Sequence, residues 1–84
     1  MEAFKERLLI EQDELIGRRK KLNDFIENED KFKQINITQQ RLLIEQNAFM
    51  KGYEDCLAKR INDIITDEEF AEYMANKINN TLNK

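Results

Sequence analysis

Arginine and lysine are the side chains of this sequence best suited to binding chemistry, because their charged N–H groups can hold an anion. The run Arg18–Lys21 places four basic residues in succession, but consecutive residues of a helix point in different directions. The favoured interpretation is therefore a solvated helix face. In an oligomer, Arg18 or Lys20 from different subunits could still converge on one anion. Three further arginines are candidates, each with an acidic neighbour nearby in the sequence: Arg7, Arg41 and Arg60.

Catalytic chemistry is poorly supported, and the sequence predicts a protein that is not an enzyme. It has no histidine, the usual general base and the commonest metal ligand. The single Cys56 lies on a predicted apolar helix face and is interpreted as a core residue. The stretch Thr66-Asp67-Glu68-Glu69 is a predicted capping box, so its carboxylates fit the first turn of a helix. No phosphate loop or calcium loop is present, so no metal and no cofactor are expected.

Composition favours long helices in one domain. The 84 residues are 40% hydrophobic and 37% charged, with no proline and two glycines, whereas sheet proteins need more turn residues. Long helices in so short a chain bury little surface, so the core is expected to be completed by oligomerisation.

Charge and targeting signals narrow the partners and the location. A net charge of −3 argues against general binding to DNA, RNA or an acidic membrane, which requires a positive excess. The single cysteine fits a reducing compartment, and neither a leader nor a membrane span is recognised. A cytoplasmic location is therefore expected.

The hexapeptide Arg-Leu-Leu-Ile-Glu-Gln occurs twice, at Arg7–Gln12 and Arg41–Gln46, with a loop-like stretch between the copies. Duplication and chance both remain open as its origin. The hydrophobic periodicity predicts a first helix over residues 2–27, a short turn over 31–35, a second helix over 38–65 capped by Thr38 or Asn36, and a third over 67–82. The predicted fold is all-α: an oligomeric, long antiparallel helical hairpin plus a short third helix, in one domain spanning residues 1–84.

The two long helices can be paired by their leucines, which recur at seven-residue spacing. In an antiparallel pair, facing positions sum to a constant, and Leu8 with Leu57, Leu15 with Met50 and Leu22 with Leu43 share one sum. Four other residues are expected beside the row of the second helix: Leu42, Phe49, Cys56 and Ile61.

Beside the leucine rows, each helix has a neighbouring row of polar residues. In the same antiparallel pairing Glu11 is expected to face Tyr53 and Arg18 to face Gln46, and these four residues form a polar band. The favoured interpretation of this band is that it fixes the helix register; a ligand site is the alternative.

Several short motifs resemble a group of small helical phage proteins first noted in crAss-like phages. The matching residues are Glu6-Arg7-Leu8, Lys21-Leu22, Phe25-Ile26, Phe32, Gln46, Met50, Tyr53, Leu57 and Arg60-Ile61. The stretch Gln46–Met50 is also similar to the Gln-x-Gly-Phe-Met stretch of phage anti-CBASS and anti-Thoeris sponge proteins. The resemblance covers about Phe4 to Ile61. Two positions depart from the sponges: Ala48 replaces the glycine, and Glu54 stands where they tend to carry a basic residue.

The resemblance implies a function without catalysis. The sponges are helical hairpins that assemble into hexamers or similar oligomers. They hold cyclic oligonucleotide or cyclic ADP-ribose signals between subunits, which keeps the host's immune effector silent. This chain would then be a homo-oligomer, from dimer to hexamer, acting in the cytoplasm of the infected host cell.

Such a ligand requires cations or amide donors for its phosphates and flat side chains for its bases. On that basis Arg7, Arg18 and Arg60 are expected to bind phosphate. Phe4 and Tyr53 are expected to stack on bases, with Gln46 as a donor to a base edge. Only Gln46 lies on the resembling motif, and the others are chosen by chemistry and predicted position.

A competing hypothesis is a self-assembling structural or adaptor protein. In that case the third helix would bind a host or phage protein through an apolar stripe made of four residues: Phe70, Tyr73, Met74 and Ile78.

Overall fold

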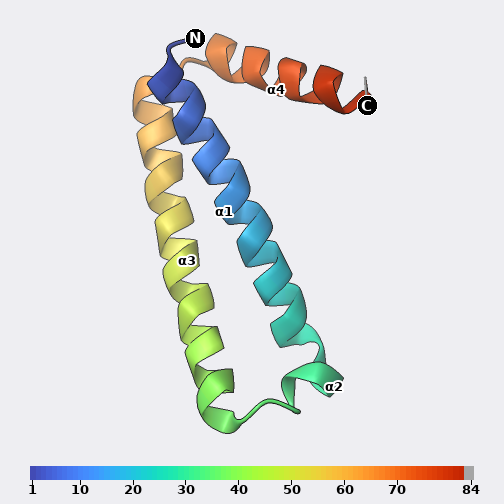
Figure 1. The fold of residues 1–84 in the computed structure, drawn as a ribbon. Coiled ribbons are helices and arrows are strands. Elements are labelled where there is room, and N and C mark those ends of the chain that lie inside the picture. Colours follow the sequence, from blue (N-terminus) through green and yellow to red (C-terminus); the bar gives the residue numbers. More distant parts are fainter. Residues whose placement is uncertain (83–84) are drawn as a thin grey trace.

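Helices account for nearly all of the computed structural model, which describes the backbone of residues 1–82 and the side chains of residues 1–79 (Figure 1). The four helices of this part are α1 (Ala3–Glu27), α2 (Glu29–Phe32), α3 (Ile37–Ile64) and α4 (Asp67–Leu82). No strand occurs among the described residues, which confirms the all-helical class. Residues 83 and 84 of the predicted domain lie outside the described part.

Side-chain caps fix where the helices around the connection begin. The Asn36 carboxamide oxygen accepts a hydrogen bond from the Gln39 amide at 2.9 Å, so Asn36 rather than Thr38 caps α3. Asn28 accepts one from the Lys31 amide at 3.3 Å, and α2 therefore starts at Glu29. The turn predicted over residues 31–35 is present, with the Gln34 amide bonded to the Lys31 carbonyl at 3.2 Å and the Ile35 amide to that of Phe32 at 3.4 Å. The helical part, α2, begins two residues before the predicted turn.

The start of α4 is a capping box, as the sequence predicts. The Thr66 hydroxyl accepts from the Glu69 amide at 3.1 Å, and the Glu69 carboxylate accepts from the Thr66 amide at 3.0 Å. The bond from the Thr66 backbone, followed by the bond from the Lys5 ammonium, holds the pKa of Glu69 below its ordinary value.

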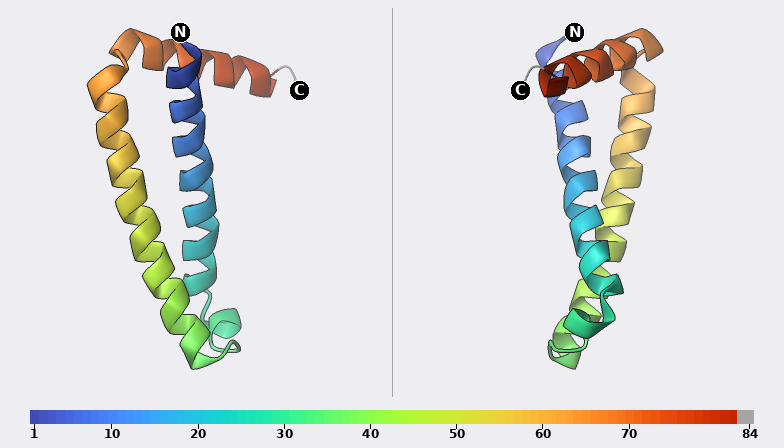
Figure 2. Two further views of the ribbon diagram at one scale, coloured as in Figure 1. Left: turned by 60° about the vertical axis from the view of Figure 1, so that its left-hand side comes forward. Right: turned by 90° about the vertical axis from the view of Figure 1, so that its right-hand side faces the viewer.

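The two long helices lie side by side and run in opposite directions (Figures 1 and 2). The connection that contains α2 lies at one end of this pair. At the other end, α4 turns away after α3 and crosses the N-terminal part of α1 (Figure 2). The molecule measures 46 × 31 × 17 Å, and its radius of gyration of 16.3 Å exceeds the roughly 12 Å of a compact domain of this length. No helix in the described part is both long and apolar enough to cross a membrane.

Buried apolar side chains gather at the end where α4 crosses. The cluster consists of Leu8, Leu9, Leu15, Leu57, Ile61 and Ile65, with Met50, Ile64 and Tyr73 packed against it. Toward the connection, Leu22 and Leu43 of the predicted rows are only half-buried. The interpretation of Cys56 as a core residue was wrong, because its side of α3 is exposed.

Candidate functional site

The polar band lies where the pairing of the helices predicts it. The Tyr53 phenol of α3 donates a hydrogen bond to the Glu11 carboxylate of α1. This bond confirms the predicted neighbourhood of Glu11 and Tyr53. It joins the two long helices at the end of the band that lies nearer the N-terminus.

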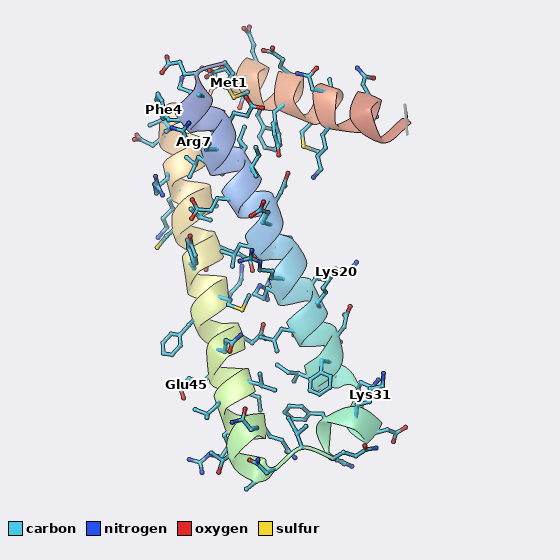
Figure 3. All side chains as sticks on the ribbon, viewed as in Figure 1. Met1, Phe4, Arg7, Lys20, Lys31 and Glu45 are labelled. Atoms are coloured by element: carbon cyan, nitrogen blue, oxygen red, sulfur yellow. The ribbon has the colours of Figure 1, made fainter. Side chains whose placement is uncertain are left out.

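A cavity of about 250 Å³ opens at the end of the band nearest the N-terminus, and we call it the terminal pocket. Its lining residues come from both long helices: Phe4, Arg7, Leu8, Glu11, Arg60 and Ile64. Phe4 and Arg7 lie together near the start of α1 (Figure 3). Two arginines and one glutamate leave this lining with a positive balance.

The charges of the terminal pocket are unequally engaged. Neither Arg7 nor Arg60 forms an ion pair with a described residue, whereas Glu11 already accepts the bond from Tyr53. The two guanidinium groups therefore keep their donors for an anion from solution, and the exposed Phe4 ring offers a flat apolar surface beside them.

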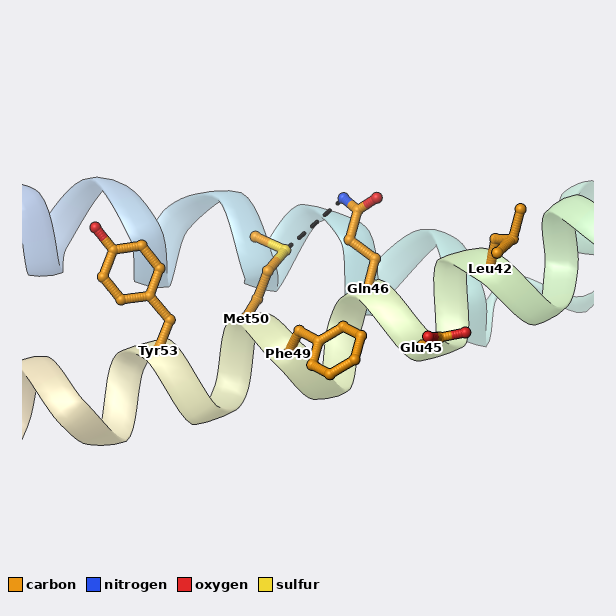
Figure 4. A pocket seen from close by; sticks show the side chains of 6 residues that line it. All are labelled: Leu42, Glu45, Gln46, Phe49, Met50 and Tyr53. Atoms are coloured by element: carbon orange, nitrogen blue, oxygen red, sulfur yellow. Dashed lines mark hydrogen bonds between the residues drawn. The ribbon is translucent and has the colours of Figure 1, made fainter.

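A second, open cavity of about 400 Å³ runs along α3, and we call it the α3 groove. Its lining residues are Leu42, Glu45, Gln46, Phe49, Met50 and Tyr53 (Figure 4). The Gln46 amide donates to the Met50 sulfur at 3.9 Å, so this amide is held along the helix. The surface is mainly apolar, which suits a hydrophobic partner better than a phosphate.

Five of the six predicted site residues thus fall into two groups, one in each cavity. Phe4, Arg7 and Arg60 meet in the terminal pocket, while Gln46 and Tyr53 line the α3 groove. Tyr53 and its partner Glu11 connect the two cavities.

Arg18 lines neither cavity. Its side chain is 74% exposed and contacts Glu14 of the same helix at 4.0 Å. The expected pairing of Arg18 with Gln46 produces no hydrogen bond between these two described side chains.

Sequence reasoning missed an ion pair between the long helices. Glu54 of α3 is only 8% exposed, the one charged residue buried in the described part, and it accepts a bond from the Arg19 guanidinium of α1. Nearby, the side-chain amide of Asn47 donates a hydrogen bond to the side-chain carboxamide oxygen of Asn23 at 3.3 Å. A signal was present in the sequence, since Glu54 stands seven residues before the buried Ile61 and three before the buried Leu57.

The stripe predicted on the third helix is divided. Tyr73 packs against the buried cluster, and its phenol donates to the Asp13 carboxylate of α1 at 2.7 Å. Met74 is half-buried, whereas Phe70 and Ile78 are exposed. Burial, and secondly the bond to Asp13, raise the pKa of Tyr73 to about 12.

Comparison with known proteins identifies one family. The model of the family described as Sequestin matches residues 2–63, which span α2, all of α1 and all but the last residue of α3. Neither the curated proteins nor the solved structures returned a match. Since the match covers most of the chain, the protein belongs to the Sequestin family, whose name indicates a sequestering function.

Proposed function

We propose that this protein is a phage counter-defence sponge that binds and sequesters a cyclic nucleotide immune signal without catalysis. The family name supports sequestration. The observation that carries the choice of ligand is the terminal pocket, where unpaired arginines from two helices lie beside an exposed aromatic ring. The antiparallel pair of α1 and α3 corresponds in this proposal to the sponge hairpin.

The chemistry of the terminal pocket suits a phosphate joined to a base. A guanidinium presents a planar set of N–H donors that matches the oxygens of a phosphate. Arg7 and Arg60 would each hold one phosphate or share one between them. Phe4 would stack on a base, a contact that tolerates any base because each has a π face.

The size of the terminal pocket supports assembly. Its volume of about 250 Å³ is below the roughly 300–1,000 Å³ of pockets that enclose a drug-sized ligand. A cyclic dinucleotide or cyclic ADP-ribose would leave much of its surface in water on a single subunit. A second subunit would cover that surface, so we propose a homo-oligomer, from dimer to hexamer, in the cytoplasm of the infected cell.

The test is a calorimetric titration of the assembled protein with cyclic dinucleotides, cyclic trinucleotides and cyclic ADP-ribose isomers. The expected result is tight binding of at least one compound, recovered chemically unchanged. Arg7→Gln and Arg60→Gln should each raise the Kd about 10- to 100-fold, because each removes charged hydrogen bonds worth about 1.5–3 kcal/mol.

Lys31→Gln is the matched control, since it removes one positive charge from an exposed position of α2 that lines neither cavity (Figure 3). Its Kd should stay that of the parent protein. Failure of the whole panel to bind would contradict the ligand class. Binding that survives both arginine substitutions would contradict the terminal pocket as the site.

The adaptor hypothesis keeps one supporting observation. The described part of α4 lies outside the family match and leaves Phe70 and Ile78 exposed. If the panel fails, binding of a host or phage protein through this helix becomes the better proposal, and Phe70→Ser with Ile78→Ser would abolish that binding.

A further inference from the structure

A second periodic stripe runs along α3 beside the one that packs on α1. We call it the outer row, and its residues alternate at steps of four and three: Leu42, Gln46, Phe49, Tyr53, Cys56 and Arg60. All six are exposed. This spacing, sustained over 19 residues, is the pattern of a coiled-coil contact line.

Among the described residues, α1 reaches only the edge of the outer row, where the Tyr53 phenol bonds Glu11 and Arg60 lines the terminal pocket. Helix α1 packs on the neighbouring side of α3, and α4 is bonded to α1 through Asp13 and Lys5. The Phe49 side chain is 70% exposed and that of Leu42 is 49% exposed. Adjacent exposed apolar side chains of this size at the edge of a groove are typical of an interaction surface.

We propose that the outer row is a dimer interface on which a second copy of this chain docks with its own α3 antiparallel. The row is self-complementary in that orientation. Phe49 would pack on Tyr53 of the second copy, Gln46 on Cys56, and Leu42 on the aliphatic part of Arg60. A twofold axis then repeats each contact, as an interface between identical subunits requires.

Charge selects the antiparallel orientation. Glu45 flanks one end of the outer row and points away from α1 (Figure 3), while Arg60 stands at the other end. Neither forms an ion pair with a described residue. Antiparallel docking places each Glu45 one helical turn from Leu42, the position that faces Arg60 of the other copy, and places Arg41 two residues from the position that faces Asp63. Both pairs are within reach of long side chains. A parallel arrangement would place identical charges opposite each other.

Gly52 is compatible with a close neighbour on this side of α3, and Gly17 on α1 likewise has open space around it. A Cβ added at Gly52 would meet nothing within 4 Å, so no contact inside the chain requires a glycine. A glycine inside a helix costs about 1 kcal/mol relative to alanine. Gly52 lies between Phe49 and Tyr53, at the midpoint of the proposed interface, where it gives the aromatic rings of the second copy room to approach.

The interface also bears on the ligand site, and this part rests on the proposed function. Arg60 belongs both to the outer row and to the terminal pocket. The second copy would place its Leu42 and Glu45 at the rim of that pocket. A ligand phosphate would then replace Glu45 of the second copy as the partner of Arg60.

Assembly is tested first without ligand, by sedimentation equilibrium. The parent protein should contain dimers, and Phe49→Glu should raise the dimer dissociation constant about thirtyfold or more, the effect of losing a central aromatic anchor. Ile44→Glu is the matched control, an exposed apolar residue of α3 outside the outer row, and should leave the constant unchanged. A monomeric parent protein, or a Phe49→Glu variant that dimerises normally, would overturn the interface.

Orientation is tested by mild oxidation. Gln46→Cys should yield a disulfide-linked dimer with the native Cys56, because antiparallel docking brings these positions together. The parent protein should not crosslink, since its two Cys56 residues would be about 15 Å apart along the helix axis. Crosslinking of the parent protein would contradict the antiparallel orientation.

The pocket claim has its own readout in the monomeric Phe49→Glu variant. Its affinity for a cyclic nucleotide that the parent protein binds should fall at least tenfold. Unchanged affinity would overturn completion of the pocket by the second copy while leaving the interface in place. Failure of the parent protein to bind any nucleotide would count against the proposed function and not against the dimer.

Discussion

The Arg19–Glu54 ion pair joins the two long helices through a carboxylate that has little access to water. Removing a charge from solvent costs several kcal/mol, and a close partner of opposite sign offsets that cost. The pair therefore adds little net stability to the fold. Loss of either partner, however, would leave a buried charge unpaired and lower the free energy of unfolding. Because it links one position of α1 to one position of α3, it also disfavours other registers.

Removal of one partner should be more harmful than removal of both. Arg19→Ala should lower the free energy of unfolding by about 3 kcal/mol, because it leaves the Glu54 carboxylate buried and unpaired. Arg19→Met with Glu54→Leu should restore most of that loss. Urea denaturation followed by circular dichroism, at one fixed protein concentration, measures both variants.

The exposed Lys51–Asp55 pair on α3 provides the comparison. Lys51→Ala should change the free energy of unfolding by less than about 0.5 kcal/mol, as expected for a solvated pair one turn apart. The prediction for the buried pair fails if the Arg19→Met, Glu54→Leu double variant is as unstable as Arg19→Ala. The lower free energy of unfolding would then come from loss of the contact itself and not from the unpaired carboxylate.

Part of the candidate site follows from the sequence at this scale. The bond between Glu11 and Tyr53 was predictable because facing positions in an antiparallel pair have a fixed sum. The role of Glu54 was not, since its sequence neighbours do not reveal that a guanidinium from the other helix reaches it. Position along a helix predicts a side chain's direction but not its partner.

Helix α4 is attached to α1 by a few polar contacts at two carboxylates, Asp13 of α1 and Glu69 of α4. Asp13 accepts from the Tyr73 phenol at 2.7 Å and from the Lys77 ammonium at 2.9 Å, and Lys5 bonds Glu69 at 3.2 Å. The capping box that starts α4 was predictable from four consecutive residues. Its docking was not, because the contacts join residues about 60 positions apart in the chain.

Alkaline pH should weaken this docking. The pKa of Tyr73 is about 12 in the folded protein, against an ordinary value of 10.0. The stabilisation is fully present below the ordinary value. It is lost as the pH rises from about 10 to about 12, because only the unfolded chain releases the proton in that range. The physical cause is burial of the phenol, reinforced by the neighbouring Asp13 charge.

Spectrophotometric titration of the Tyr53→Phe variant isolates Tyr73, since the sequence has only two tyrosines. The absorbance change should be centred near pH 12, and Asp13→Asn should move it lower. A transition near pH 10 with Asp13 present would contradict the docked position of Tyr73.

For the molecule as a whole, the distribution of buried residues is unequal between its two ends. The buried cluster lies where α4 crosses the helix pair, and no described apolar residue in the half toward the connection is buried. Seven-residue rows run along both helices, so the sequence predicted contacts along their full length. The sequence could not indicate that α4 covers only one end of the helix pair.

Amide hydrogen exchange should reflect this difference. In the monomeric Phe49→Glu variant, the slowest amides should lie around Leu8–Leu15 and Leu57–Ile61, because these segments open only with the buried cluster. Amides around Leu22 and Leu43 should exchange at least tenfold faster. Uniform exchange along α1 and α3 would contradict a core confined to one end.

The outer row shows a more general limit of periodicity. Leu42, Phe49 and Cys56 were assigned beside the apolar row of the second helix, yet all three are exposed. An apolar pattern indicates that a helix face packs against a partner. It does not show whether that partner is another part of the same chain or another molecule. The core is small and the outer row is exposed for the same reason: the apolar residues of α3 are divided between the side that packs on α1 and the side that faces away from it.

The connection between α1 and α3 has a practical value that follows from its place in the molecule. It lies at the end opposite the terminal pocket and α4 (Figures 1 and 3). Lys33 and Gln34 in this connection are both exposed. A fluorescent label attached there would disturb neither the arginines nor the buried cluster, so the labelled protein could be followed through binding and assembly experiments with its pocket intact.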